Sequence, residues 1–168
     1  MKANFVIILL VNVLLFLNSC AKDPSVTKSN LNIDYSKFVT IKHGLWGSCT
    51  YLTGDCMPMI GGNSSCKSEP VKRTIYVYAP TVDSQAVQIG GPNSSFYSQI
   101  NTQLIAQTQS EDNGFYQISL QPGRYTILIL EQGKYYCMDW GGQHQLAPVT
   151  VDSITATRRD LVIDMAVH

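Results

Sequence analysis

Cysteine and histidine are the residues of this chain whose chemistry could define a site. Beyond position 20 the chain has an even set of cysteines: Cys49, Cys56, Cys66 and Cys137. In an oxidising compartment such a set predicts disulfides, and four cysteines allow three pairings that the sequence leaves open. A metal site would instead need short fixed spacings such as Cys-x-x-Cys, which do not occur, and the histidines are scattered at His43, His144 and His168. We therefore expect no metal and no cofactor.

A fifth cysteine closes the N-terminal segment, in the run Leu17-Asn18-Ser19-Cys20. A basic Lys2 and an apolar span of residues 5–17 precede it, which is typical of a secretory signal that is removed. The span is shorter than the ~20 residues that cross a bilayer. A cysteine directly after the cleavage point resembles a bacterial lipoprotein signal, in which the Cys20 thiol is diacylated, for example with palmitate. The alternatives are a plain signal peptide or a transmembrane anchor.

This N-terminal signature predicts the location of the protein. Residues 1–19 form the expected signal peptide, and Cys20 attaches the mature chain to a membrane by its lipid. We expect a cell-envelope protein of the outer membrane, facing either the periplasm or the cell surface. Removing residues 1–19 takes away one lysine and no acid, so twelve Lys/Arg become eleven against twelve Asp/Glu, a formal charge of −1. Without a basic stripe, nucleic-acid binding is not expected.

Catalytic chemistry finds little support in the sequence. Asp139 and His144 could join a serine in a triad, but the nucleophile pattern Gly-x-Ser-x-Gly is missing. A redox role would need Cys-x-x-Cys, which is missing as well. The acidic run Glu111-Asp112-Asn113 offers too few oxygens for calcium and is better interpreted as a turn. We therefore expect no enzyme, and a small hydrolase is kept only as a third hypothesis.

The elements that position these residues follow from periodicity. Residues 20–41 show no sustained apolar period, which predicts a lipidated cysteine followed by a flexible tether. From His43 onward apolar residues alternate with a period of two, and on Leu45, Gly47 and Cys49 we expect one shared face. Strands are predicted over 45–51, 74–79, 115–120, 125–130 and 161–167. Residues 53–70 and 80–95 are predicted to be long connections, and residues 96–103 a short helical turn or a strand start.

Two turns carry information about strand pairing. Asn113-Gly114 and Pro122-Gly123 each have residues suited to tight turns. We expect the strands on either side of each turn to be antiparallel neighbours. Several short strands with turn signals and no helices predict a sandwich or barrel. A Cys56–Cys66 bridge would close the first long connection and stabilise the fold by about 2–3 kcal/mol in the loop-entropy model.

Residues 108–126, which include Asp112-Asn113-Gly114 and Pro122-Gly123-Arg124-Tyr125, resemble the core signature of carboxypeptidase regulatory-like domains, also called transthyretin-like or prealbumin-like domains. Residues 44–50 resemble the first strand of that family, with Cys49 at a position usually held by Val. The resemblance implies an all-β, seven-stranded Greek-key sandwich over residues 42–168 and no catalytic residues. With the Cys20 signal, the chain resembles small lipoproteins of Bacteroidetes-type bacteria. The two long connections depart from the family pattern.

Candidate binding residues are aromatic. If Tyr76 and Tyr78 face outward, they form with Trp140 a surface for a glycan or protein; alternatively, the tyrosines pack at the edge of a sheet or under loops. The leading hypothesis is a lipid-anchored, non-enzymatic binding or adhesion module of the envelope. The second is a structural accessory subunit that pairs with a partner through a sheet edge. The run Asp152-Ser153-Ile154 also resembles a short O-glycosylation acceptor of Bacteroidetes, which makes Ser153 a weak candidate for modification.

Overall fold

A computed structural model describes residues 33–58 and 65–168 of the chain. Residues 34–168 form one compact unit. The expected signal peptide, the lipidated Cys20 and the tether as far as residue 32 lie outside the described residues.

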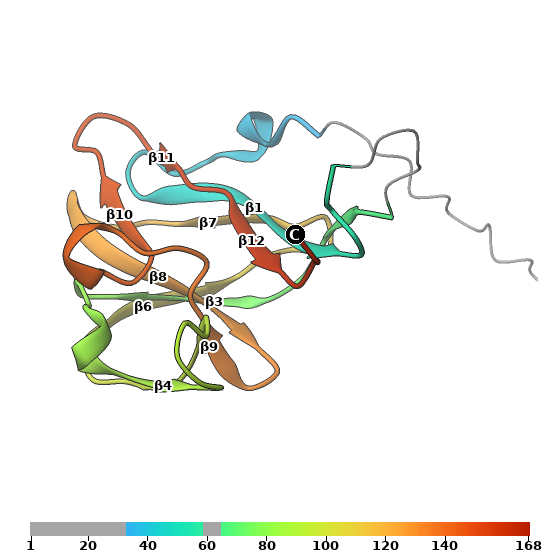
Figure 1. Cartoon of the computed structure of the whole chain (residues 1–168). Coiled ribbons are helices and arrows are strands. Elements are labelled where there is room, and N and C mark those ends of the chain that lie inside the picture. Colours follow the sequence, from blue (N-terminus) through green and yellow to red (C-terminus); the bar gives the residue numbers. More distant parts are fainter. Residues whose placement is uncertain (1–32, 59–64) are drawn as a thin grey trace, which may run out of the picture. The chain divides into compact units, whose positions relative to one another are not determined.

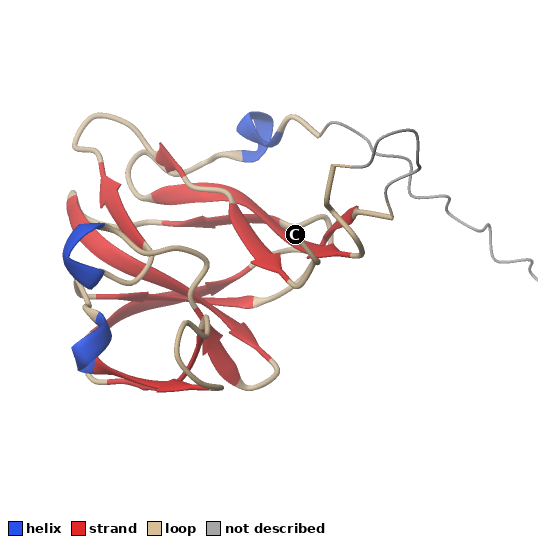
Figure 2. Ribbon diagram, in the orientation of Figure 1, coloured by secondary structure: helices blue, strands red, loops and turns tan. Residues whose placement is uncertain are grey.

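The described part of the chain is almost entirely β-structure, as Figure 2 shows. Its only helices are three short 3-10 turns: η1 (Tyr35–Phe38), η2 (Asp83–Gln85) and η3 (Gly142–His144). The strands, in chain order, are β1 (Leu45–Thr53), β2 (Lys67–Pro70), β3 (Thr74–Tyr78), β4 (Ala86–Ile89), β5 (Phe96–Ile100), β6 (Leu104–Gln109), β7 (Phe115–Ile118), β8 (Gly123–Glu131), β9 (Lys134–Tyr136), β10 (Pro148–Val151), β11 (Thr157–Arg158) and β12 (Leu161–Asp164). The predicted all-β sandwich is confirmed, with its strands divided into these shorter segments.

The first sheet is built around β1. One flank of β1 pairs antiparallel with β7 and then with β2, and the other flank pairs in parallel with β11 and then with β12. On each side of β1 two short strands therefore pair with it, one after the other. The nine residues of β1 thus pair with four strands, including β12 near the C-terminus.

The second sheet follows the order β4-β5-β9-β8-β3-β6, and β10 pairs with the first half of β8. β8 is the long central strand of this sheet, as β1 is of the first. In Figure 1, β3, β6 and β8 lie between β1 and the β4–β9 region. Both faces of the middle strands are therefore covered, and Leu128 is buried on one face of β8 while Ile127 and Ile129 are buried on the other.

The core between the sheets follows the period-two pattern. Leu45, Gly47 and Cys49 are buried on one face of β1, as predicted from their spacing. Ile75 and Val77 face them from the second sheet and are fully buried. Successive side chains of a strand point to opposite faces, so these alternating positions supply the apolar surface that the two sheets bury together.

The two predicted turns reverse the chain, but the expectation that they join antiparallel neighbours is wrong. At Asn113-Gly114 the Gly114 N–H donates to Glu111 O at 2.9 Å, yet β6 before the turn pairs with β3 and β7 after it pairs with β1. At Pro122-Gly123 the chain passes from β7 in the first sheet to β8 in the second. Both turns therefore connect one sheet to the other. In a sandwich, a tight turn can join strands of different layers as well as neighbours within one sheet.

The hairpin with a tight turn lies one strand further along the chain, after β8. β8 and β9 are joined through Gln132 and Gly133, whose φ values of 50° and 75° are those of a type I′ turn. β4 and β5 form a second antiparallel pair. The long connection expected over residues 80–95 thus contains η2 and β4, residues 96–100 form a strand and no helical turn, and the connection over 53–70 ends in β2.

The packed domain begins before residue 42. Tyr35 donates its hydroxyl proton to Asn113 O at 2.6 Å and stacks on Phe115 at a centroid distance of 6.0 Å. Thr40 exchanges two hydrogen bonds with the Gln117 side chain, both at 3.0 Å. Residues 34–41, which the sequence analysis included in the tether, therefore pack against β7 and the turn before it.

Candidate functional site

The cysteines divide into a bridged pair and two buried thiols. Cys56 and Cys66 form a disulfide with an S–S distance of 2.03 Å, which confirms the disulfide expected in the first long connection. Cys49 and Cys137 are free and fully buried, so the second disulfide that an even set of cysteines predicts does not form. Burial raises the pKa of each thiol to about 11, because the thiolate would lose its hydration. Neither thiol is suited to nucleophilic chemistry at neutral pH.

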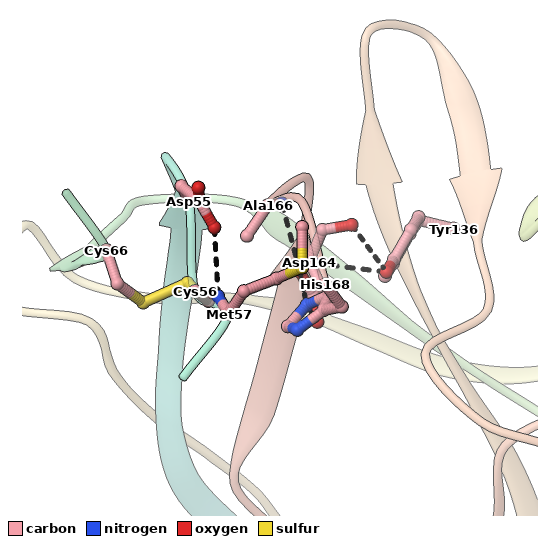
Figure 3. A network of polar contacts seen from close by, with 8 residues as sticks. All are labelled: Asp55, Cys56, Met57, Cys66, Tyr136, Asp164, Ala166 and His168. Carbon is pink, nitrogen blue, oxygen red and sulfur yellow. Dashed lines mark hydrogen bonds and ion pairs between the residues drawn. A yellow bond between two sulfur atoms is a disulfide. The ribbon is translucent and has the colours of Figure 1, made fainter. Parts of the chain in front are cut away.

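The disulfide belongs to a network that holds the end of the chain, shown in Figure 3. The Cys56 N–H donates to Val167 O, and the Val167 N–H donates to Gly54 O, both at 2.9 Å. At the end of β12, the Asp164 carboxylate accepts a hydrogen bond from the Ala166 N–H and lies 2.9 Å from His168 Nε2. Tyr136 from the second sheet accepts a hydrogen bond from the Asp164 N–H at 3.0 Å. These contacts are structural and tie the C-terminus to β1 and β9.

Of the two interpretations of Tyr76 and Tyr78, the outward-facing surface does not form. Tyr78 is only 5% exposed, and Tyr76 is partly buried. Tyr135 of β9 covers both rings, at centroid distances of 5.4 Å from Tyr76 and 5.9 Å from Tyr78, and the Tyr78 hydroxyl donates to the Tyr135 hydroxyl at 3.0 Å. The alternative interpretation, in which the tyrosines pack within the sheet region, is the one that the structure supports.

Trp140 is the expected binding aromatic that does reach the surface. Its side chain is 44% exposed, and its Nε1–H donates to the Tyr97 hydroxyl at 3.3 Å. Tyr97 lies on β5 and is almost fully buried, which raises the pKa of its hydroxyl. The indole is therefore held by a rigid anchor while part of its ring faces solvent. Sequence inspection gave no sign of this anchor, since Tyr97 lies in a segment of uncertain secondary structure.

The loop that carries Trp140 is fixed at many points, and we call residues 137–147 the Trp140 loop. Gly141 and Gln145 are joined by an N–H to carbonyl bond of 2.8 Å, and the Ala147 N–H donates to Asp139 O at 2.8 Å. Gln143 and His144 adopt left-handed φ values of 58° and 57°, which are uncommon for residues other than glycine. Such conformations persist only where the surroundings enforce them, so the loop has a defined shape.

Polar side chains surround the Trp140 loop. His144 Nδ1 lies 3.4 Å from Asp83 Oδ2, and Arg159 Nη2 donates to both oxygens of Asp139 at 2.8 Å. Gln145 accepts a 2.8 Å hydrogen bond from Arg124. Asp139 and His144 thus have different partners, and neither is joined to a serine among the described residues. The loop combines a flat apolar ring with exposed donors and acceptors.

A shallow open groove of about 440 Å³ lies elsewhere on the domain. Residues 36–43 form one wall, residues 154–156 form the other, and Trp46 lies between them. Trp46 donates its Nε1–H to Ala156 O at 3.2 Å, and Arg158 lies over its ring at 5.5 Å. Ile154 at the rim is 80% exposed, and the adjoining Ser153 is exposed as well.

Two further findings concern ligands and membranes. Within residues 33–58 and 65–168, His, Cys, Asp and Glu side chains form no cluster that could hold a metal ion. The same residues include no helix of the length and hydrophobicity that crossing a bilayer requires.

Comparison with known proteins adds no relative: no family model, no curated protein and no solved structure matches this chain.

Proposed function

We propose that this chain is a lipid-anchored module of the bacterial cell envelope whose sandwich domain binds an envelope glycan or protein through the Trp140 loop. The single observation that carries the binding role is the exposed Trp140 ring, fixed by Tyr97 on a loop of defined shape. A preorganised aromatic surface loses little entropy on binding, and indole rings provide flat apolar area for sugar faces and peptide side chains.

The polar neighbours of Trp140 support a neutral, hydroxyl-rich or amide-rich ligand. Gln143, Gln145 and His144 offer donors and acceptors, while Asp139 is already paired with Arg159 and Asp83 lies beside His144. The paired charges leave no strong excess of either sign on the loop. A glycan or an uncharged protein loop therefore suits this surface better than a nucleic acid or a strongly charged peptide.

The envelope location rests on the sequence around Cys20. Diacylation of that thiol would supply more than one acyl chain, which is the requirement for stable membrane attachment. The all-β sandwich fits the fold expected of a carboxypeptidase regulatory-like domain, which in this proposal acts as the binding module. We place the protein at the outer membrane, with the domain on the periplasmic side or at the cell surface.

The test of the binding role is a Trp140→Ala variant of the purified protein, assayed on an array of envelope glycans and in pull-downs from envelope extracts. We expect captured ligands to bind at least about fivefold more weakly, because removal of a central aromatic anchor commonly costs more than ~1 kcal/mol. Ile154→Ala is the matched control: it removes an exposed apolar side chain outside the Trp140 loop and should leave binding unchanged. A protein that binds nothing in either assay, or an equal loss in both variants, would refute the proposal.

A further inference from the structure

The free edges of the two sheets differ in how they are protected. In the first sheet, β2 presents Lys67, Glu69 and Pro70, residues that discourage pairing with another strand. β12 ends at Asp164, whose N–H is already bonded to the Tyr136 hydroxyl. The outer strands β2 and β12 are thus protected by charged side chains, by a proline or by a side chain that occupies the free N–H.

Two edge strands of the second sheet have no such protection. Among the described residues β6 pairs only with β3, and β4 pairs only with β5. A third outer strand, β10, pairs only with β8 and begins with Pro148, which lacks an N–H donor. The whole segment from Ser84 to Ser110, which contains β4, β5 and β6, has no charged residue. Three exposed apolar side chains lie on these edges: Val87 on β4, and Leu104 and Ile105 on β6, each 41–45% exposed.

The backbone of β6 is available for pairing over a short stretch. The Ser110 N–H donates to Arg73 O just beyond the β3–β6 ladder. Alternate residues of an antiparallel strand bond to the same neighbour, so Ala106 and Thr108 bond toward β3 while Gln107 presents its N–H and C=O to the free side. Ile105 has no opposite residue on β3, because the register shifts there. Toward the turn the edge is partly covered, since Thr108 Oγ1 donates to Gln117 O at 3.3 Å.

We infer that β6 is a docking edge for a second copy of this chain, with the two β6 strands antiparallel about Gln107. An edge with charged residues would select a partner of opposite charge, whereas an uncharged edge can align with itself without like-charge repulsion. Pairing about a two-fold axis uses the same edge of both copies, so the assembly closes as a dimer. Opposed Gln107 side chains can hydrogen-bond to each other, and Ile105 of each copy lies opposite Gln109 of the other copy, whose methylene groups cover part of it.

The dimer is weak, because the shared edge is short and the buried area falls in the range of transient contacts. It is independent of the proposed role of Trp140, which lies outside β6. The measurement is light scattering after size exclusion, on the purified full chain in detergent over a range of protein concentrations. We expect a concentration-dependent dimer that Ile105→Lys weakens by at least tenfold, without a change in the melting temperature.

Val87→Lys is the matched control, because it places the same charge at an equally exposed apolar residue on the opposite edge, β4. It should leave the dimer intact. In addition, Gln107→Cys should give a covalent dimer on mild oxidation, since opposite residues of an antiparallel pair lie within disulfide range.

Four outcomes would overturn this inference. A chain that stays monomeric at every concentration has no self-pairing edge. If Val87→Lys loses association and the wild type forms species larger than dimers, the contacts are head-to-tail, between β4 of one copy and β6 of the next. A monomer that co-purifies with a stoichiometric envelope protein, lost in Ile105→Lys, would assign the edge to a different partner. A thiol-to-amine cross-linker that joins Gln107→Cys to Lys22 or Lys28 of the same chain would assign the edge to the N-terminal segment.

Discussion

At the scale of single residues, Gly47 determines how closely the first sheet can pack. A Cβ at this position would lie 2.3 Å from Arg159 O and 2.7 Å from Arg159 C, both backbone atoms that cannot move aside. The same Arg159 carbonyl accepts a hydrogen bond from the buried Tyr116 hydroxyl. Gly47 lies on the buried face of β1, and the absence of a side chain there allows the backbone of Arg159 to approach closely.

We therefore expect Gly47→Ala to destabilise the domain by ~1–3 kcal/mol, since overpacking against backbone forces local rearrangement. Chemical denaturation followed by intrinsic fluorescence gives the free energy of unfolding. Gly142→Ala serves as the control, because a Cβ there would meet no atom within 4 Å. Equal stability of the two variants would show that the contact between Gly47 and Arg159 is looser than these distances indicate.

At the scale of elements, the Asp160 side chain replaces the missing backbone pairing at the break between β11 and β12. Where the parallel ladder to β1 is interrupted, the Asp160 carboxylate accepts from the Ser48 N–H at 2.9 Å and from the Ser48 hydroxyl at 3.0 Å. Arg158 donates to the other carboxylate oxygen at 2.9 Å. Burial alone would raise the pKa of Asp160, but these hydrogen bonds together hold it below the ordinary value of 3.8.

A lowered pKa makes the ionised carboxylate more favourable in the folded chain than in the unfolded chain. Its stabilisation is complete above the unfolded pKa, near 3.8, and is lost as the pH falls through the lower folded pKa. We expect Asp160→Asn to be less stable than wild type by roughly 1 kcal/mol at pH 7, because the group is partly exposed. The difference should shrink below pH 4. Thermal unfolding across pH 2–7 measures it, with exposed Glu69→Gln as the control; a difference that stays constant across this range would contradict the prediction.

The elements also show which parts of a fold the sequence can predict. Period-two alternation located β1, β3, β7, β8 and β12, because alternate residues of each strand contribute to the core between the two sheets. Alternation does not indicate which sheet a strand joins, and so the strands around Asn113-Gly114 and Pro122-Gly123 were assigned as neighbours when they belong to different layers. β4 was missed because it is a four-residue strand in a segment rich in glycine, asparagine and serine, whose turn signals dominate.

The candidate site depends on contacts that the sequence could suggest only in part. Trp140 was a candidate because an exposed aromatic ring offers flat apolar area with a polar group, which favours binding of a glycan or protein. Packing of Tyr78 at a sheet edge or under loops was one of two interpretations, because alternation predicts that Tyr78 faces away from Val77 but does not show that Tyr135 covers that face. The anchoring of Trp140 by Tyr97 joins residues far apart in the chain, and no local pattern reports such a contact.

At the scale of the whole molecule, the proposal depends on a single covalent event at Cys20. A Cys20→Ser variant retains every described residue of the domain, so we expect an unchanged melting temperature together with loss of the protein from the membrane fraction. Thermal unfolding measures the melting temperature, and fractionation of the bacterial envelope measures membrane attachment. Incorporation of labelled palmitate reports whether the chain is acylated. Lys22→Ala, two residues away, controls for changes in the mature N-terminus and should remain membrane-bound and labelled. If Cys20→Ser stays in the membrane fraction without label, the protein is held there by another contact, and the anchored binding module must be replaced by a peripheral one.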